Sequence, residues 1–338
     1  MTDFSRYDRQ IKLSEIGAEG QEKLHAAKIL IIGVGGLGCP ASMYLAAAGV
    51  GNIGLVDFDK VDDSNLHRQV LFIEDDLGKN KAEAAKDRLN RRNSHINVVA
   101  FNVPFGIDNA IELISKYDLI LDGTDNFQTK YLINDACLKA NKPFVGASIY
   151  KYQGQLSVFN YQNGPSYRCL YPNHHYKDSS NCEETGVLGV LPGILGTMQA
   201  TEALKIILGV GTPLSGKVKI VDTLTMQDQL IQFQRKEDEI NKIKNQPLEL
   251  EQAICSLSEA SHLYLDVREP FEQPRPCNDN LIEIPLSQLK ERNDEIPKDQ
   301  AVHVFCQSGI RSKKAIELLE KEFGFSNLVD AGGIEELI

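Results

Sequence analysis

The stretch ILIIGVGGLGCPASMYLAAAGVGNIGLVDFD, residues 29–59, decides the fold class of this chain. An apolar run rich in β-branched residues ends in glycines, a small-residue segment follows, and a second apolar run ends on acidic residues. That order predicts a strand, a helix and a second strand of a parallel sheet. Strand and helix patterns then alternate up to about residue 150, which predicts a doubly wound, Rossmann-like α/β sheet with helices on both faces.

The pattern changes after residue 150 and restarts near residue 248. GQLSVFNY, residues 154–161, predicts an antiparallel strand, so the sheet is expected to be mixed. The charged segment RKEDEINKIKNQP, residues 235–247, predicts a linker. We therefore expect a first domain over residues 1–234, a linker over 235–247, and a small α/β domain over 248–338.

Composition and charge narrow the classes of function. The chain has 36 Lys and Arg residues against 47 Asp and Glu residues, a formal net charge of −11, which argues against binding to nucleic acid or to an anionic membrane. No apolar run approaches the roughly 20 residues of a membrane span, and the polar start lacks an apolar signal core. The seven cysteines are scattered, as expected for free thiols in a reducing compartment. We expect a cytoplasmic protein.

Three glycines within the opening stretch predict a nucleotide site. Gly33, Gly35 and Gly38 fit the pattern G-x-G-x-x-G between the expected strand and helix. Glycines let the backbone approach a phosphate, and the helix N-terminus supplies N–H donors. Asp57 closes the next strand, where its carboxylate can accept hydrogen bonds from ribose hydroxyls. This motif alone does not separate NAD from ATP.

Charged residues near this motif favour ATP. Asn65 and Arg68 lie in DSNLHRQ, residues 63–69, and Lys81 lies at the start of a helix. Such cations can neutralise a triphosphate and stabilise a leaving pyrophosphate, whereas a dehydrogenase would have no use for them there. At the end of a later strand, Asp122 or Asp125 could hold Mg²⁺, which prefers carboxylate and phosphate oxygens.

A second candidate site is VFCQSGIRS, residues 304–312. Cys306 ends a strand pattern, and the following residues can curl so that backbone N–H groups point at its sulfur above a helix N-terminus. Such a loop stabilises a thiolate or a persulfide anion, and Arg311 is expected to add positive charge. The alternative is a buried thiol that merely ends a strand.

Several of these segments together resemble a known family. They are RYDRQI (6–11), GVGGLGCPASMYLAAAGVGNIGLVDFDKVDDSNLHRQ (33–69), GKNKAEAA (78–85), DLILDGTDN (118–126), and YRCL (167–170) followed by a later cysteine and TGVLGVLPGILGTMQATEALK (185–205). These segments are similar to the MoeB/ThiF family of the ubiquitin-activating-enzyme superfamily. The resemblance covers residues 1 to about 233. VFCQSGIRS, between LYLDVRE (263–269) and VDAGGI (329–334), resembles the active-site loop of a rhodanese domain. The combination resembles the adenylyltransferase–sulfurtransferases of molybdopterin biosynthesis and thiolation pathways.

The resemblance implies an activity and its partners. Such enzymes use ATP and Mg²⁺ to adenylate the C-terminal glycine of a ubiquitin-like sulfur-carrier protein ending in Gly-Gly (MoaD/ThiS-like), and then help form a thiocarboxylate. The sulfur would travel as a persulfide on Cys306, supplied by a donor such as a cysteine desulfurase. A homodimer is also implied. The competing hypotheses are an NAD-dependent oxidoreductase and a non-catalytic carrier-binding scaffold.

The resemblance also assigns roles to single residues. Asp125 matches a magnesium ligand, with Asn126 beside it, and Arg9 matches an arginine that reaches the ATP of the partner subunit. Cys182 matches a cysteine that attacks the adenylated carrier or takes part in sulfur relay. The matched ATP-binding positions are Gly36, Asp57, Ser64, Asn65, Arg68 and Lys81.

One departure from the family concerns zinc. Members often hold a structural zinc ion with two C-x-x-C pairs. Here Ser166 stands where the first cysteine is expected, which leaves Cys169 alone, and no C-x-x-C follows the helix expected over residues 193–209. One thiolate is too few for a structural zinc site, so we expect no zinc.

Overall fold

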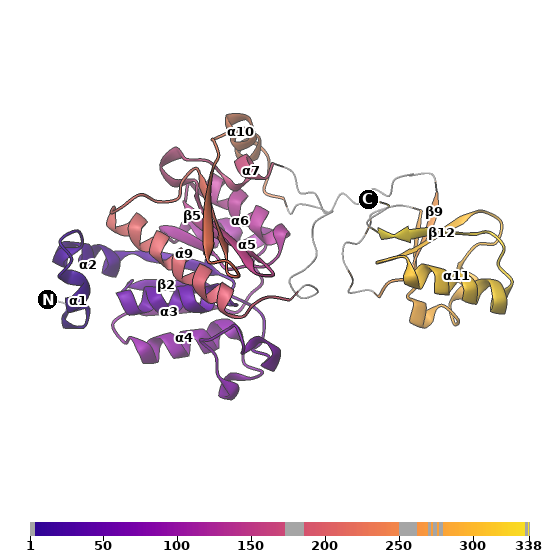
Figure 1. The fold of residues 1–338 in the computed structure, drawn as a ribbon, viewed down its shortest axis with the longest axis horizontal. Coiled ribbons are helices and arrows are strands. Elements are labelled where there is room, and N and C mark those ends of the chain that lie inside the picture. The colour runs from indigo at the N-terminus through magenta and orange to yellow at the C-terminus, as the bar shows by residue number, and fades with distance from the viewer. Residues whose placement is uncertain are drawn as a thin grey trace. The chain divides into compact units, whose positions relative to one another are not determined.

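The computed structural model describes residues 4–172, 186–249, 262–269, 272, 276, 280–334 and 337. These fall into two compact units, the first ending at described residue 249 and the second holding the described residues from 262 onward (Figure 1). No helix in the described ranges is long and apolar enough to cross a membrane.

The first unit is built on one eight-stranded sheet with the order β3-β2-β1-β4-β5-β6-β7-β8. The strands are β1 (Lys28–Ile32), β2 (Asn52–Val56), β3 (Asn97–Phe101), β4 (Leu119–Asp122), β5 (Phe144–Tyr150), β6 (Gln153–Phe159), β7 (Lys217–Asp222) and β8 (Gln227–Gln232). Neighbours from β3 to β5 pair in parallel, whereas β6, β7 and β8 pair antiparallel. The predicted mixed, Rossmann-like sheet is confirmed.

Helices cover both faces of this sheet. The longer ones are α2 (Gly17–Ala26), α3 (Gly38–Ala48), α4 (Lys81–Arg92), α5 (Ile107–Ser115), α6 (Phe127–Ala140), α9 (Val190–Leu208) and α10 (Glu237–Asn245), and the short ones are α1 (Asp8–Ile11) and α7 (Tyr167–Leu170). Residues of α3, α4 and α9 share one apolar core with the sheet, while residues of α5 and α6 share a second. The two cores hold β1, β2 and β4 so that their carboxyl ends lie together at one end of the sheet. In open α/β sheets, ligands bind at this end.

The charged segment 235–247 differs from the expected linker, because it contains α10. Ile240 and Ile243 are buried against Leu138 and Cys169. The ammonium of Lys139 also donates to the backbone oxygen of Ile243 at 2.7 Å, near the end of α10. Apolar residues three apart give the charged helix one buried side, so the first unit continues beyond residue 234.

The second unit is a four-stranded parallel sheet with the order β10-β9-β11-β12. Its elements are β9 (Leu263–Asp266), β10 (Leu281–Glu283), β11 (Val302–Cys306), α11 (Ile310–Phe323) and β12 (Leu328–Gly333). Its core includes Leu265, Val304, Ala315 and Leu319. Within this unit, Cys306 is the last residue of β11, and α11 begins shortly after it at Ile310.

Candidate functional site

The glycine loop joins β1 to α3. Gly33 has a φ of +87°, a left-handed conformation that favours glycine. A Cβ on Gly38 would collide with the backbone oxygen of Gly33, so the turn closes only with glycine at this position. At Gly35, by contrast, an added Cβ would have room, because its nearest atom would be the Gln69 amide nitrogen at 3.7 Å. The loop therefore brings backbone N–H groups to the start of α3, as an anion site requires.

Asp57 is bound directly to this loop. The Val34 N–H donates to Asp57 Oδ2 at 2.7 Å, and the Asp59 N–H donates to Oδ1 at 2.9 Å. Burial raises the pKa of Asp57 above its ordinary value, against the Val34 hydrogen bond and the charge of Lys81, which favour the carboxylate. Each carboxylate oxygen keeps a lone pair that can accept from a ribose hydroxyl.

Lys81 is held by a carboxylate that sequence reasoning missed. Its Nζ lies 3.1 Å from Asp59 Oδ2, with the lysine side chain 9% exposed and the aspartate 53% exposed. Asn80, the N-cap of α4, donates from Nδ2 to the backbone oxygens of Asp57 and Asp59. These bonds fix the start of α4 against the end of β2. The only sequence signal for Asp59 is its place two residues after Asp57.

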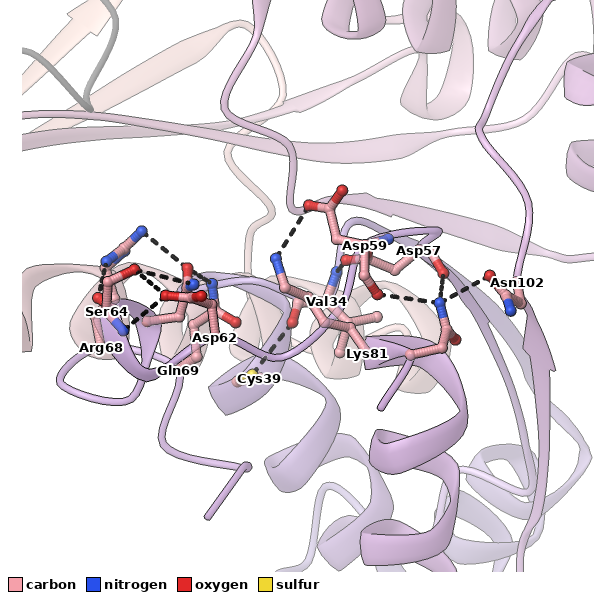
Figure 2. A network of polar contacts seen from close by, with 12 residues as sticks. Val34, Cys39, Asp57, Asp59, Asp62, Ser64, Arg68, Gln69, Lys81 and Asn102 are labelled. Atoms are coloured by element: carbon pink, nitrogen blue, oxygen red, sulfur yellow. Dashed lines mark hydrogen bonds and ion pairs between the residues drawn. The ribbon is translucent and has the colours of Figure 1, made fainter. Parts of the chain in front are cut away.

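Arg68 belongs to a second cluster at the same edge. Its Nη1 donates to the Ser64 backbone oxygen at 3.0 Å, and its Nη2 donates to Asn65 Oδ1 at 3.1 Å. Within the described residues no carboxylate pairs with it, so its charge stays available for an anion. Gln69 is buried and donates to the same Asn65 oxygen at 2.8 Å. Figure 2 shows Arg68 and Ser64 to one side of Val34, and Asp57, Asp59 and Lys81 to the other.

Asp125 and Asn126 follow β4, the strand beside β1. Both are exposed, and Asn126 caps α6 by accepting from the Thr129 N–H at 2.8 Å. A Cβ on Gly33 would lie 2.8 Å from the Gly123 carbonyl carbon, so the turn that carries Asp125 packs directly against the glycine loop. The structure thus places the predicted magnesium ligand beside the predicted phosphate site.

The residues present fit a magnesium ion that is shared with a nucleotide. The described residues contain no group of three or more His, Cys, Asp and Glu side chains able to hold a metal. Mg²⁺ commonly binds through one or two carboxylates together with substrate phosphates and water. A single exposed carboxylate at Asp125, next to a phosphate loop, meets that requirement.

Two predicted residues are not joined to this cluster. Arg9 is exposed on α1, and its side chain makes no hydrogen bond to the other candidate residues in the described chain. Cys182 lies outside the described residues.

Cys169, the one cysteine left at the family's zinc position, is surrounded by hydrogen-bond donors and apolar side chains. Cys169 Sγ accepts hydrogen bonds from the Ser166 N–H at 3.4 Å and the Lys236 N–H at 3.2 Å. Ile240 and Ile243 of α10 close over it. Arg235 Nη1 ties the same segment to the Asn163 backbone oxygen at 3.0 Å. In this chain, hydrogen bonds and apolar contacts hold together the segments around residues 166 and 236.

Cys306 lies at the floor of a loop of backbone donors. The Gly309 N–H donates to Sγ at 3.1 Å, and Gly309 has a φ of +80°, which turns the loop back over the sulfur. Burial acts to raise the pKa of Cys306, but the backbone N–H groups of Ser312, Ser308, Arg311 and Gly309 near the sulfur outweigh it and lower the pKa. The structure therefore places backbone N–H groups beside the Cys306 sulfur, as the sequence pattern predicts.

The predicted contribution of Arg311 is altered by a neighbour. Its guanidinium makes two hydrogen bonds to Glu272, at 2.6 and 2.5 Å. Arg268, fully buried, pairs with Asp266 and donates from Nη1 to Gln307 Oε1 at 3.1 Å. The Arg311 charge is thus paired with Glu272, and Arg268 contacts the loop through the Gln307 side chain.

Comparison with known proteins adds to this geometry. Residues 7–242 match the model of the ThiF family. The chain is 38% identical to "Adenylyltransferase and sulfurtransferase MOCS3" of Drosophila sechellia, over 95% of this chain and 80% of the relative. It is also 38% identical to "Probable molybdopterin-synthase adenylyltransferase" of Porphyra purpurea, over 95% of this chain and 90% of the relative.

Solved structures resemble a large part of this chain. Escherichia coli MccB with ATP superposes with a TM-score of 0.61 at 26% identity, over 69% of this chain and 73% of MccB. MccB with AMPCPP and MccA superposes with a TM-score of 0.62 at 28% identity, over 70% of this chain and 73% of that one.

Proposed function

The chain belongs to the ThiF family, and from this premise we propose which of its residues activate a carboxylate and which carry sulfur. It is an adenylyltransferase with sulfurtransferase activity that acts on a ubiquitin-like sulfur carrier. The observation that supports the residue assignment is the binding of Asp57 to the glycine loop through the Val34 N–H, with Arg68 and Lys81 at the same edge.

In the first step, the C-terminal carboxylate of the carrier attacks the α-phosphorus of ATP. One P–O bond forms, the bond to pyrophosphate breaks, and an acyl-adenylate results. Asp57 binds the ribose, while the glycine loop at Gly33, Gly35, Gly36 and Gly38 binds phosphate through its N–H groups. Ser64, Asn65 and Arg68 hold the leaving pyrophosphate, whose growing negative charge the Arg68 guanidinium stabilises.

Lys81 and Asp125 complete this site. Lys81 is directed by Asp59, and we assign it to the phosphates. Asp125 is the proposed ligand of Mg²⁺, and Asn126 fixes the start of α6 beside it. When bound, the metal neutralises phosphate charge and orients the leaving group. Arg9 is proposed to reach the site of the partner subunit in a homodimer.

In the second step, the terminal sulfur of a Cys306 persulfide attacks the acyl carbon. The C–S bond forms as the C–O bond to AMP breaks, which leaves the carrier joined to Cys306 through an acyl disulfide. A second thiol then attacks the Cys306 sulfur, so that a disulfide forms and the carrier leaves as a thiocarboxylate. Cys182 is the proposed second thiol. The proposed donor of the persulfide sulfur is a cysteine desulfurase, and the compartment is the cytoplasm.

ATP–pyrophosphate exchange tests the adenylation site. With small carriers that end in Gly-Gly, the wild type should exchange label and Asp125→Ala should not. Asp108→Ala, which removes an exposed carboxylate at the start of α5, is the matched control and should retain exchange. Absence of exchange with every carrier, together with binding of NAD, would favour an oxidoreductase. Carrier binding without ATP turnover would favour a scaffold.

Persulfide transfer tests the sulfur site separately. Cys306→Ser should lose formation of the thiocarboxylate, detected by the mass of the carrier, while it keeps pyrophosphate exchange. Transfer that persists in Cys306→Ser would show that another residue carries the sulfur.

A further inference from the structure

Ser312 connects the Cys306 loop to β12. It is fully buried in the first turn of α11, and its backbone N–H is one of the donors that lower the pKa of Cys306. Its hydroxyl lies 2.8 Å from Asp330 Oδ1 and 3.0 Å from the Gly309 backbone oxygen. A hydroxyl carries a single proton, and a charge-assisted bond to a carboxylate is the stronger of the two. The Ser312 side chain is therefore held by Asp330.

Asp330 is itself fixed in place. The same oxygen, Oδ1, accepts the Gly332 N–H at 3.1 Å, and β12 pairs with β11 up to Cys306 and Gly333. The carboxylate thus bridges the strand beside Cys306 and the helix that supplies N–H groups to its sulfur. A small rotation of the first turn of α11 would turn those N–H groups away from the sulfur, since hydrogen bonds weaken steeply with angle.

We infer that Asp330 is a positioning residue for the Cys306 thiolate, acting through Ser312. It does not act through its charge, because a second anion near the sulfur would favour the protonated thiol. It acts by holding the first turn of α11 so that backbone N–H groups face Sγ. The inference deepens the proposed role of Cys306 in sulfur transfer and rests on that role for its relevance.

The pKa of Cys306 provides the test without any need for sulfur transfer. The full chain is treated with iodoacetamide from pH 5 to pH 10, and the rate of labelling at Cys306 is followed by mass spectrometry of its peptide. The midpoint of the profile reports the thiol pKa, whereas access to the sulfur changes only the plateau. We expect Asp330→Leu and Ser312→Ala each to raise the midpoint by about one pH unit, the effect of weakening one hydrogen bond to a charged group.

Asp330→Asn separates position from charge. Its side-chain oxygen can still accept from the Ser312 hydroxyl and the Gly332 N–H, so the midpoint should stay within about 0.3 units of wild type or fall slightly. A rise in Asp330→Asn equal to that in Asp330→Leu would overturn the positioning role. Unchanged midpoints in both Asp330→Leu and Ser312→Ala would overturn it as well. If Asp330→Leu does not fold, the Ser312→Ala result decides alone.

The outcome is independent of whether the proposed sulfur chemistry is right. Suppose that the midpoint rises in Asp330→Leu and Ser312→Ala as expected, but the wild type forms no thiocarboxylate. The positioning role of Asp330 would then stand, and the sulfur-carrying role of Cys306 would be rejected. Thiocarboxylate formation in Ser312→Ala at a rate that recovers as the pH is raised would support both, because a higher pH restores the thiolate.

Discussion

The ammonium of Lys130 lies 2.9 Å from Asp122 Oδ2, and the two side chains are only 5% and 3% exposed. The same ammonium donates to the Ala147 backbone oxygen at 2.7 Å, while Asp122 Oδ1 accepts from the Thr124 N–H at 2.9 Å. This buried pair therefore joins α6 and β5 to the turn that leads to Asp125. The position of this pair explains how the exposed Asp125 carboxylate can have a defined place beside the glycine loop.

Removing the Lys130 ammonium should lower the stability of the fold. Lys130→Met leaves the Asp122 carboxylate buried without its partner, so we expect the free energy of unfolding to fall by about 3–5 kcal/mol. Lys130→Arg keeps the charge and should retain most of the stability and of the ATP–pyrophosphate exchange. Chemical denaturation followed by circular dichroism measures the change.

The exposed pair between Lys116 and Glu112 supplies the control for this experiment. Both side chains are more than half exposed, so Lys116→Met should cost less than about 1 kcal/mol. If Lys130→Met were no more destabilising than Lys116→Met, the buried pair would not hold the Asp125 turn in place.

Asp57 gives a prediction about pH. Because burial raises its pKa, the folded protein binds this proton more tightly than the unfolded chain does, and the ionised carboxylate costs stability at neutral pH. Asp57→Asn removes this cost but leaves the Val34 or the Asp59 N–H without its acceptor, so the two effects on the free energy of unfolding should largely cancel at pH 7. The variant should nevertheless bind nucleotide about tenfold more weakly, since the amide offers only one acceptor oxygen to Val34, Asp59 and the ribose.

The binding measurement is a titration with a fluorescent ATP analogue from pH 8 down to the lowest pH at which the protein stays folded. In the wild type, affinity should fall as the pH drops through the raised pKa of Asp57, above the range of an ordinary aspartate. In Asp57→Asn, the affinity should change less over the same range. Parallel pH curves for the two proteins would contradict the assignment of Asp57 to the ribose.

The sequence predicted the features that depend on residues close together in the chain. The glycine loop, Asp57 at the end of β2 and Cys306 at the end of β11 each follow from a short pattern of residues. Charge pairs could not be predicted in this way. Lys81 with Asp59, Lys130 with Asp122 and Arg311 with Glu272 are 22, 8 and 39 residues apart, and only the packing of elements brings them together.

The linker expectation was wrong for a related reason. The segment 235–247 is dominated by charge, and its two isoleucines, Ile240 and Ile243, look too few to bury a helix. They are buried because Leu138 and Cys169 of the first unit pack against them. Local composition does not reveal such a receiving surface.

The packing around Cys169 predicts independence from zinc. Dialysis against EDTA should leave the thermal unfolding midpoint unchanged, because hydrogen bonds and α10 hold the segments that a metal would otherwise join. Ile240→Ala should instead lower the free energy of unfolding by about 2–5 kcal/mol, the cost of a core cavity. Ile231→Ala, at an exposed position on β8, should change it by less than about 0.5 kcal/mol.

A fall in the midpoint after EDTA that added zinc restores would show that the chain does hold a structural metal. The two isoleucine variants would then be uninformative about the metal, but they would still measure what α10 contributes.

The ion pair between Arg311 and Glu272 leads to a prediction about the rate of sulfur transfer from an anionic donor. Arg311 lowers the pKa of Glu272, so the glutamate is ionised at neutral pH and cancels the guanidinium charge beside the Cys306 loop. Glu272→Gln should free that charge and accelerate sulfur transfer from thiosulfate, a dianion, to cyanide. We expect about a fivefold rise in rate, equivalent to about 1 kcal/mol, the upper value for a partly exposed ion pair. Glu272→Gln combined with Arg311→Gln removes both charges and should return the rate to that of wild type or below. A rate that rises equally in the single and the double variant would mean that Glu272 limits access to the sulfur and does not act on the charge of Arg311.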